Sequence, residues 1–248
     1  MFESKSKSGI TSHIIEEYGD LLRLTYIYFL TSFVLGFFLS FNDWGVGDVL
    51  DINSGAVNFF ISFLVVLFVL LFHHIMMLYE ARKHGAKLEI GLWPMGIVTS
   101  IAISFFTFGM IIFPLMFLER ISSGFQIGKR ASVRLTPTEK SQIASMGLMS
   151  FVVMLFLSRL FPSMYIGEKL FAISAFFIIF NCIPLYHNLN LYIFTGAKTS
   201  WAFVVPFAIG AVLFFYFVSS VLLAGAVSFL LAFLIWVLYH YYHEHYKL

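Results

Sequence analysis

The side chains that could do chemistry gather at the end of one apolar run. Residues 57–79 are apolar and long enough to span a bilayer, and they contain His73 and His74, with Glu80 immediately after them. His73, Met77 and Glu80 are spaced i, i+4 and i+7, so a helix places them on one face. Imidazole nitrogens and carboxylates are groups that bind zinc in proteins. Because ionisable groups in a membrane segment are costly, we predict that this helix end is the functional site.

The composition is that of a protein that crosses the bilayer several times. Of the 248 residues, 60% are hydrophobic, 32 are Phe and only 11% are charged, which excludes an ordinary soluble domain. The net charge of +2 is spread over loops beside apolar tracts, so we expect the lipid bilayer and not nucleic acid as a partner. No tract alternates in polarity as a barrel strand would. We therefore predict an all-α polytopic membrane protein, with residues 1–248 as a single membrane domain.

Six apolar tracts approach the length of about 20 residues that a spanning helix needs. Ahead of the third, Thr136 is predicted to cap a helix whose first residue is Pro137. The loop 42–56 carries three Asp and no Lys or Arg, whereas Arg82 and Lys83 follow the second tract. The positive-inside rule then places the N- and C-termini in the cytoplasm. The predicted spans are residues 24–41, 57–79, 147–161, 170–184, 201–219 and 221–239.

A seventh apolar tract, residues 92–118, either crosses the bilayer once or enters it and returns. A single crossing would put the basic loop that follows, with Arg120, Arg130 and Lys140, on the outside, against the positive-inside rule. A tract that bends near Gly96, Gly109 and Pro114 keeps this loop inside, and irregular backbone at membrane depth is tolerated where it is buried against protein. We predict the re-entrant arrangement.

Two segments carry a resemblance to a known family. The first is HHIMM at residues 73–77, followed by LWPMG at 92–96, and the second is FNCIP at 180–184, which includes Asn181 and Pro184. This pattern resembles the site-2 protease family of intramembrane zinc metalloproteases, particularly its archaeal members. That family has H-E-x-x-H on a membrane helix, a similar Leu-Trp-Pro turn, and F-N-x-I-P followed by a turn that ends in L-D-G. The resemblance implies a site-2-protease-like core.

The departures from the family pattern fall on the catalytic groups. The resemblance implies that two His and one Asp bind zinc and that the Glu activates a zinc-bound water. His73 matches the first His, but His74 stands at the position of the Glu and Met77 at the position of the second His. Leu189 stands at the position of the Asp. A thioether is poorly suited to zinc in a site of nitrogen and oxygen ligands, and His is a poor substitute for the carboxylate base.

Two hypotheses of function follow from this pattern. The first is a catalytically inactive, site-2-protease-like protein without a cofactor, which binds or scaffolds a membrane helix of a partner protein. The alternative is an intramembrane zinc metalloprotease with displaced ligands, in which His73 acts with His187 or Glu80. His73, Glu80 and His187 would form a set of two His and one carboxylate with plausible zinc chemistry.

Overall fold

The computed structural model describes residues 4–46, 49–114, 116–123, 135–161, 164–183, 189–218 and 220–245. Within these ranges the chain is mostly helical, and six helices are long and apolar enough to cross a membrane. The protein is therefore an integral membrane protein whose spans are helices. The six helices are α1 (Ser4–Leu39), α2 (Ile52–Lys83), α4 (Pro137–Ser158), α5 (Tyr165–Cys182), α7 (Lys198–Phe217) and α8 (Val221–His245).

Each predicted span lies on one of these helices, but the helix ends differ because polar residues cap them outside the apolar tract. Asp51 caps α2, where its side chain accepts a hydrogen bond from the Ser54 backbone N–H. Thr136 and Glu139 form a reciprocal capping box that starts α4 at Pro137, as the sequence predicted. At the end of α5, Ile183 is extended, as expected of a residue before proline.

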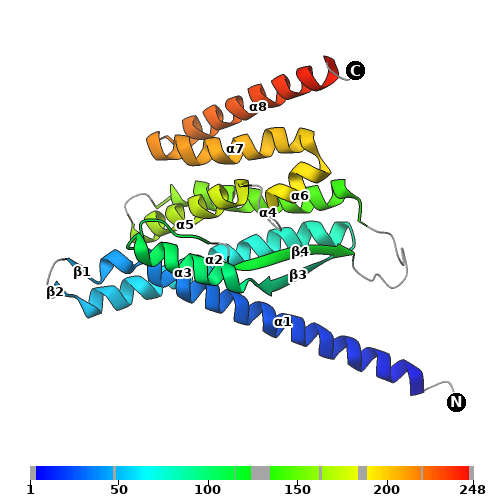
Figure 1. Ribbon diagram of the computed structural model, residues 1–248, viewed down its shortest axis with the longest axis horizontal. Helices are drawn as coiled ribbons and strands as arrows, with labels where there is room; N and C mark the ends of the chain where they lie inside the picture. Colours follow the sequence, from blue (N-terminus) through cyan, green and yellow to red (C-terminus); the bar gives the residue numbers. More distant parts are fainter. Residues whose placement is uncertain are drawn as a thin grey trace.

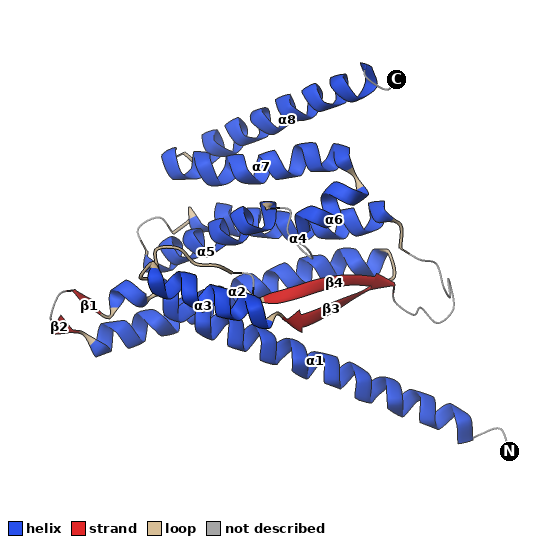
Figure 2. Ribbon diagram, in the orientation of Figure 1, coloured by secondary structure: helices blue, strands red, loops and turns tan. Residues whose placement is uncertain are grey.

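The tract predicted to re-enter contains both a helix and strands, which the all-α prediction did not include. Strand β3 (Ala86–Leu92) leads into the short helix α3 (Pro94–Phe106), and the chain returns to strand β4 (Phe117–Ser123). β3 and β4 are antiparallel, and Leu92 lies directly opposite Phe117, so the two ends of the tract meet (Figure 2). This meeting of the two ends is the geometry that a re-entrant segment requires.

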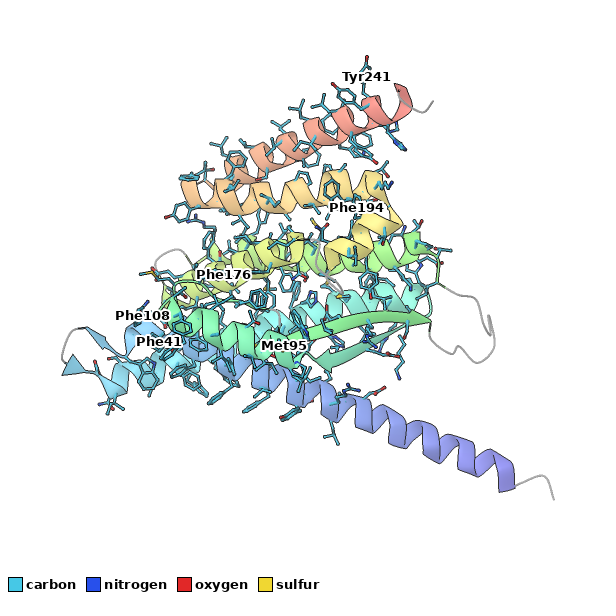
Figure 3. All side chains as sticks on the ribbon, in the orientation of Figure 1. Phe41, Met95, Phe108, Phe176, Phe194 and Tyr241 are labelled. Carbon is cyan, nitrogen blue, oxygen red and sulfur yellow. The ribbon has the colours of Figure 1, made fainter. Side chains whose placement is uncertain are left out.

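The turn that follows α3 in this tract packs on the end of α1. Phe108 and Gly109 both have positive φ there, and a Cβ atom on Gly109 would lie 2.6 Å from the Phe38 carbonyl oxygen. Figure 3 shows Phe41 and Phe108 close together, and their ring centroids are 6.5 Å apart. Glycine is therefore required at this turn, both for its φ and for the close approach.

The helices form successive layers (Figure 1). α1, α2, α3 and the two strands lie at one end, α4, α5 and the short helix α6 (Leu189–Gly196) in the middle, and α7 and α8 at the other end. α2 packs against α4 and α5, and these three helices contribute half of the largest fully buried side chains in the described residues. A short 3-10 helix, η1 (Phe41–Asp43), and a pair of two-residue strands, β1 (Gly45–Val46) and β2 (Val49–Leu50), join α1 to α2.

Candidate functional site

His73 is buried where α2 meets α4, and its side chain is only 2% exposed. Its Nδ1 atom lies 3.0 Å from the Gly147 carbonyl oxygen and 3.0 Å from the Ser150 hydroxyl. A carbonyl oxygen only accepts hydrogen bonds, so Nδ1 carries a hydrogen and donates it. The Ser150 hydroxyl donates to the same carbonyl at 2.6 Å, which leaves its lone pairs facing the imidazole. The ring is thus fixed in one orientation by α4.

The other ring nitrogen of His73 faces a carboxylate that the sequence analysis did not identify. Nε2 lies 3.0 Å from one oxygen of Glu119 and 3.2 Å from the other. Glu119 belongs to β4, and its side chain is only 11% exposed. A hydrogen between Nε2 and the carboxylate therefore joins two buried groups, and the pair as a whole is neutral in either protonation arrangement.

The ionised form of Glu119 is favoured by its neighbours. Burial disfavours a charged carboxylate, but the positive charge on His73 and its hydrogen bond outweigh burial, with a smaller contribution from His74. As a result, the pKa of the Glu119 carboxyl lies below its usual value. Glu119 is therefore the ionised partner of the buried His73 side chain.

The imidazole of His73 stacks on an aromatic ring and lies close to a glycine of α4. The His73 ring stacks on Phe151 with centroids 4.4 Å apart and an interplanar angle of 12°. Phe151 in turn stacks on Phe177 at 4.7 Å and 3°, so one column of rings joins α2, α4 and α5. A Cβ atom on Gly147 would lie 2.9 Å from the imidazole and 2.8 Å from the Met77 sulfur. Only glycine therefore permits this close approach.

The positions at which the family resemblance expects the other zinc ligands are filled by packed apolar side chains. Met77 is fully buried one turn after His73, and Leu189 is buried at the start of α6. Asn181 is also buried, and its amide donates to the Phe177 carbonyl oxygen one turn earlier at 2.9 Å. Pro184 and His187 lie outside the described residues. In this part of the chain the motif residues act as core.

His74 interacts electrostatically with Glu119, whereas Glu80 lies apart from the His73–Glu119 pair. The His74 ring meets Tyr28 of α1 edge-on, with centroids 5.7 Å apart. Its buried Nδ1 atom has no hydrogen-bond partner in the described part of the molecule. Glu80 forms an ion pair with Lys83 at 2.6 Å and lies 3.5 Å from His84, both on its own helix end. The shared helix face of His73 and Glu80 therefore does not bring their side chains to one site.

Glu119 could have been found from strand alternation. Phe117 and Ile121 are buried and Glu119 lies between them, so period two places all three on the face of β4 that meets the helices. Leu118 and Arg120 lie on the opposite face. The apolar tract defined from the sequence ends at residue 118, one residue before Glu119, and so does not include this alternation.

A buried imidazole paired with a carboxylate and oriented by a carbonyl oxygen has the form of a proton-transfer pair or of part of a metal site. Zinc needs at least three protein ligands, and the described residues offer two here, the Nε2 atom of His73 and the Glu119 carboxylate. Among the side chains that the structure describes, no three His, Cys, Asp or Glu groups are placed to hold one metal ion. The described residues thus do not fit the zinc that the resemblance implies.

Comparison of the chain with models of protein families, with curated proteins and with solved structures gives no match. The likeness to site-2 proteases rests on the two sequence motifs.

Proposed function

We propose that this chain is a non-catalytic, site-2-protease-like membrane protein that binds a membrane helix of a partner protein. One observation carries the non-catalytic half: His73, the one catalytic group that the motif retains, has both ring nitrogens bonded inside the protein, to Gly147 and Glu119. A zinc-activated water needs an open metal position and a base beside it. Where the base would stand, His74 packs against Tyr28.

The core has instead the features of a rigid scaffold. The column of rings through His73, Phe151 and Phe177 ties three membrane helices together, and the ion pair with Glu119 ties the strands to them. Aromatic pairs in such geometry stabilise a fold beyond the burial of their area. Fixed helices are what a membrane protein needs to present a preformed surface to a partner.

The partner helix is proposed to bind an aromatic surface shared by α1 and α2. Phe29 pairs edge-on with Phe63, and Phe33 pairs with Phe59, each at 5.3 Å between centroids. Phe29, Phe33 and Phe60 are about half exposed, at 56%, 48% and 58%. Phenylalanine has only two side-chain torsions, so these rings lose little entropy when another helix packs on them. This surface lies on the first two spans, with the N-terminus of α1 proposed to be cytoplasmic.

Metal content tests the non-catalytic half of the proposal. We expect the purified, detergent-solubilised chain to contain no stoichiometric zinc and to leave a candidate membrane peptide uncleaved. The matched variant His74→Glu, Met77→His and Leu189→Asp restores the family pattern, and its gain of zinc and cleavage would identify a disarmed protease. Zinc bound to the native chain, with cleavage abolished by His73→Ala, would instead establish the metalloprotease with displaced ligands, in which His187 completes the site.

Site-directed photocrosslinking tests the partner surface. A photoreactive phenylalanine at position 33 or 60 should give one discrete protein adduct in native membranes, and Phe29→Ala should reduce its yield. The matched control is position 234 on α8, where Leu234 is 56% exposed and thus equally open to the membrane. Equal protein adducts from Leu234, or lipid adducts alone from all three positions, would refute the partner surface.

A further inference from the structure

A groove opens between helices α1 and α2 and the strands β3 and β4. Its volume is about 950 Å³, and α1, α2, β3 and β4 all line it. Leu118 and Arg120 face the groove, whereas Glu119 between them faces the buried pair. His74 of α2 also lines the groove, so the groove borders the site already described, whereas His73 and Glu119 are not among its lining residues.

The groove carries more positive than negative charge. Lys87 forms an ion pair with Asp20 at 2.8 Å, across the groove from β3 to α1. Arg23 from α1, Arg82 from α2 and Arg120 from β4 also line it. None of these three guanidinium groups lies within ion-pair distance of a carboxylate in the described ranges.

The remaining carboxylate of the groove is Glu89. It lies directly opposite Arg120 in the strand register and accepts a hydrogen bond from the Ser122 hydroxyl at 3.1 Å. It offsets at most one of the three guanidinium charges. Arg23, moreover, rests over β3, with its Nη2 atom 3.5 Å from the position of a Cβ atom on Gly91. The net charge of the groove thus favours an anion.

Apolar side chains form the rest of the wall and reach into the membrane-spanning helices. Leu24 lies within the membrane-spanning part of α1, and Leu78 belongs to α2 one turn before Arg82. Leu92 and Leu118 add apolar surface from the strands. A ligand that complements both the basic and the apolar walls of the groove must be negatively charged at one end and apolar at the other. Basic pockets between membrane helices near the headgroup region bind anionic lipids for this reason.

We propose that the groove binds one anionic phospholipid. The lipid phosphate is held by the guanidinium groups of Arg23, Arg82 and Arg120, which bind phosphate oxygens in a bidentate manner. The glycerol backbone and the first part of the acyl chains lie along Leu24 and Leu78. A volume of about 950 Å³ suits a headgroup with the first part of its chains and is too small for a membrane helix. This site is independent of the proposed partner surface.

The test uses the full chain, delipidated in detergent, and native mass spectrometry of bound lipid. The probes are dioleoyl phosphatidylglycerol and dioleoyl phosphatidylcholine, which share their chains and differ in net charge. We expect one phosphatidylglycerol per chain in preference to phosphatidylcholine. A third measurement adds glycerol 3-phosphate at millimolar concentration as a competitor of phosphatidylglycerol. Its failure to displace the lipid would show that the ligand is the lipid and not a free phosphate compound.

The matched variants remove charge inside and outside the groove. Arg23→Gln with Arg120→Gln should weaken phosphatidylglycerol binding roughly 25-fold, since one basic residue near an anionic surface contributes roughly fivefold. Lys140→Gln with Lys198→Gln removes the same charge elsewhere and should leave binding unchanged. The single variant Arg82→Gln, at an exposed helix end, gives a second measurement that does not disturb the fold. Equal loss in both double variants, unchanged binding in the groove variants, or no preference for phosphatidylglycerol would each overturn the proposal.

Discussion

The Nε2 atom of His73 lies 3.0 Å from a carboxylate oxygen of Glu119, and this contact joins α2 to β4 across 46 residues of sequence. Both side chains are almost completely buried. Removal of one partner therefore leaves the other side chain buried, in a medium of low dielectric constant, without the group that offsets its charge.

We expect Glu119→Ala to lower the free energy of unfolding by about 3 kcal/mol, because breaking a buried ion pair typically costs about 3–5 kcal/mol. The double variant with His73→Ala should be less destabilised than the sum of the two single variants, since the pair acts as a unit. Denaturant titration of the purified protein in detergent measures all three. Glu89→Ala, an exposed change on the neighbouring strand, is the control and should cost less than about 0.5 kcal/mol. Simple additivity would show that the pair does not interact.

The stability of the protein should depend on pH through Glu119. Its pKa is lowered in the folded state, so the unfolded chain binds more protons as the pH falls below the ordinary glutamate value of 4.5. The stabilisation from Glu119 is complete above that value and is lost as the pH falls through the folded-state pKa. Unfolding measured between about pH 6 and pH 3 should therefore show a steeper loss in the native chain than in Glu119→Gln. Parallel curves for the two proteins would contradict this assignment.

Gly147→Ala should destabilise the protein by about 1–3 kcal/mol, because the added methyl group meets the His73 ring at 2.9 Å and neither helix can easily move. Gly210→Ala is the matched control, since the new methyl group would lie 3.5 Å from Ser228 at ordinary contact distance. We expect that change to be neutral or slightly stabilising. Thermal unfolding in the same detergent compares the two variants. An equal change in melting temperature would show that the space beside Gly147 accommodates a methyl group without strain.

Cysteine labels should place Asn53 on one side of the membrane, with Lys83 and Lys140 together on the other. Asn53 follows the acidic loop before α2, and Lys83 ends that helix. Lys140 follows the tract at residues 92–118 and shares the side of Lys83 only if that tract returns, as the pairing of its two ends leads us to expect. An impermeant thiol reagent applied to sealed vesicles measures access. Access to Lys140 from the side of Asn53 would show that the tract crosses once.

The sequence predicts the helices better than the site. Long apolar runs and the cap at Thr136 are local signals, and the structure has a helix on each predicted span. The pairing of Leu92 with Phe117 joins residues far apart in sequence, and no local pattern encodes it. Strand alternation can place Glu119 on the buried face of β4, but no local pattern pairs it with His73, and i+7 spacing points instead to Glu80 on the same helix. The carboxylate that meets His73 comes from another element, at a distance that only the tertiary fold determines.

The column of rings through His73, Phe151 and Phe177 also limits how the protein can move. A slide of α4 along its axis by one helical turn, 5.4 Å, would break the stacking of Phe151 on His73 and on Phe177. It would also break both hydrogen bonds to the Nδ1 atom of His73. α2, α4 and α5 thus behave as one rigid body in any functional motion. The outermost helix, α8, packs chiefly on α7, and it is the part that can swing without breaking that body.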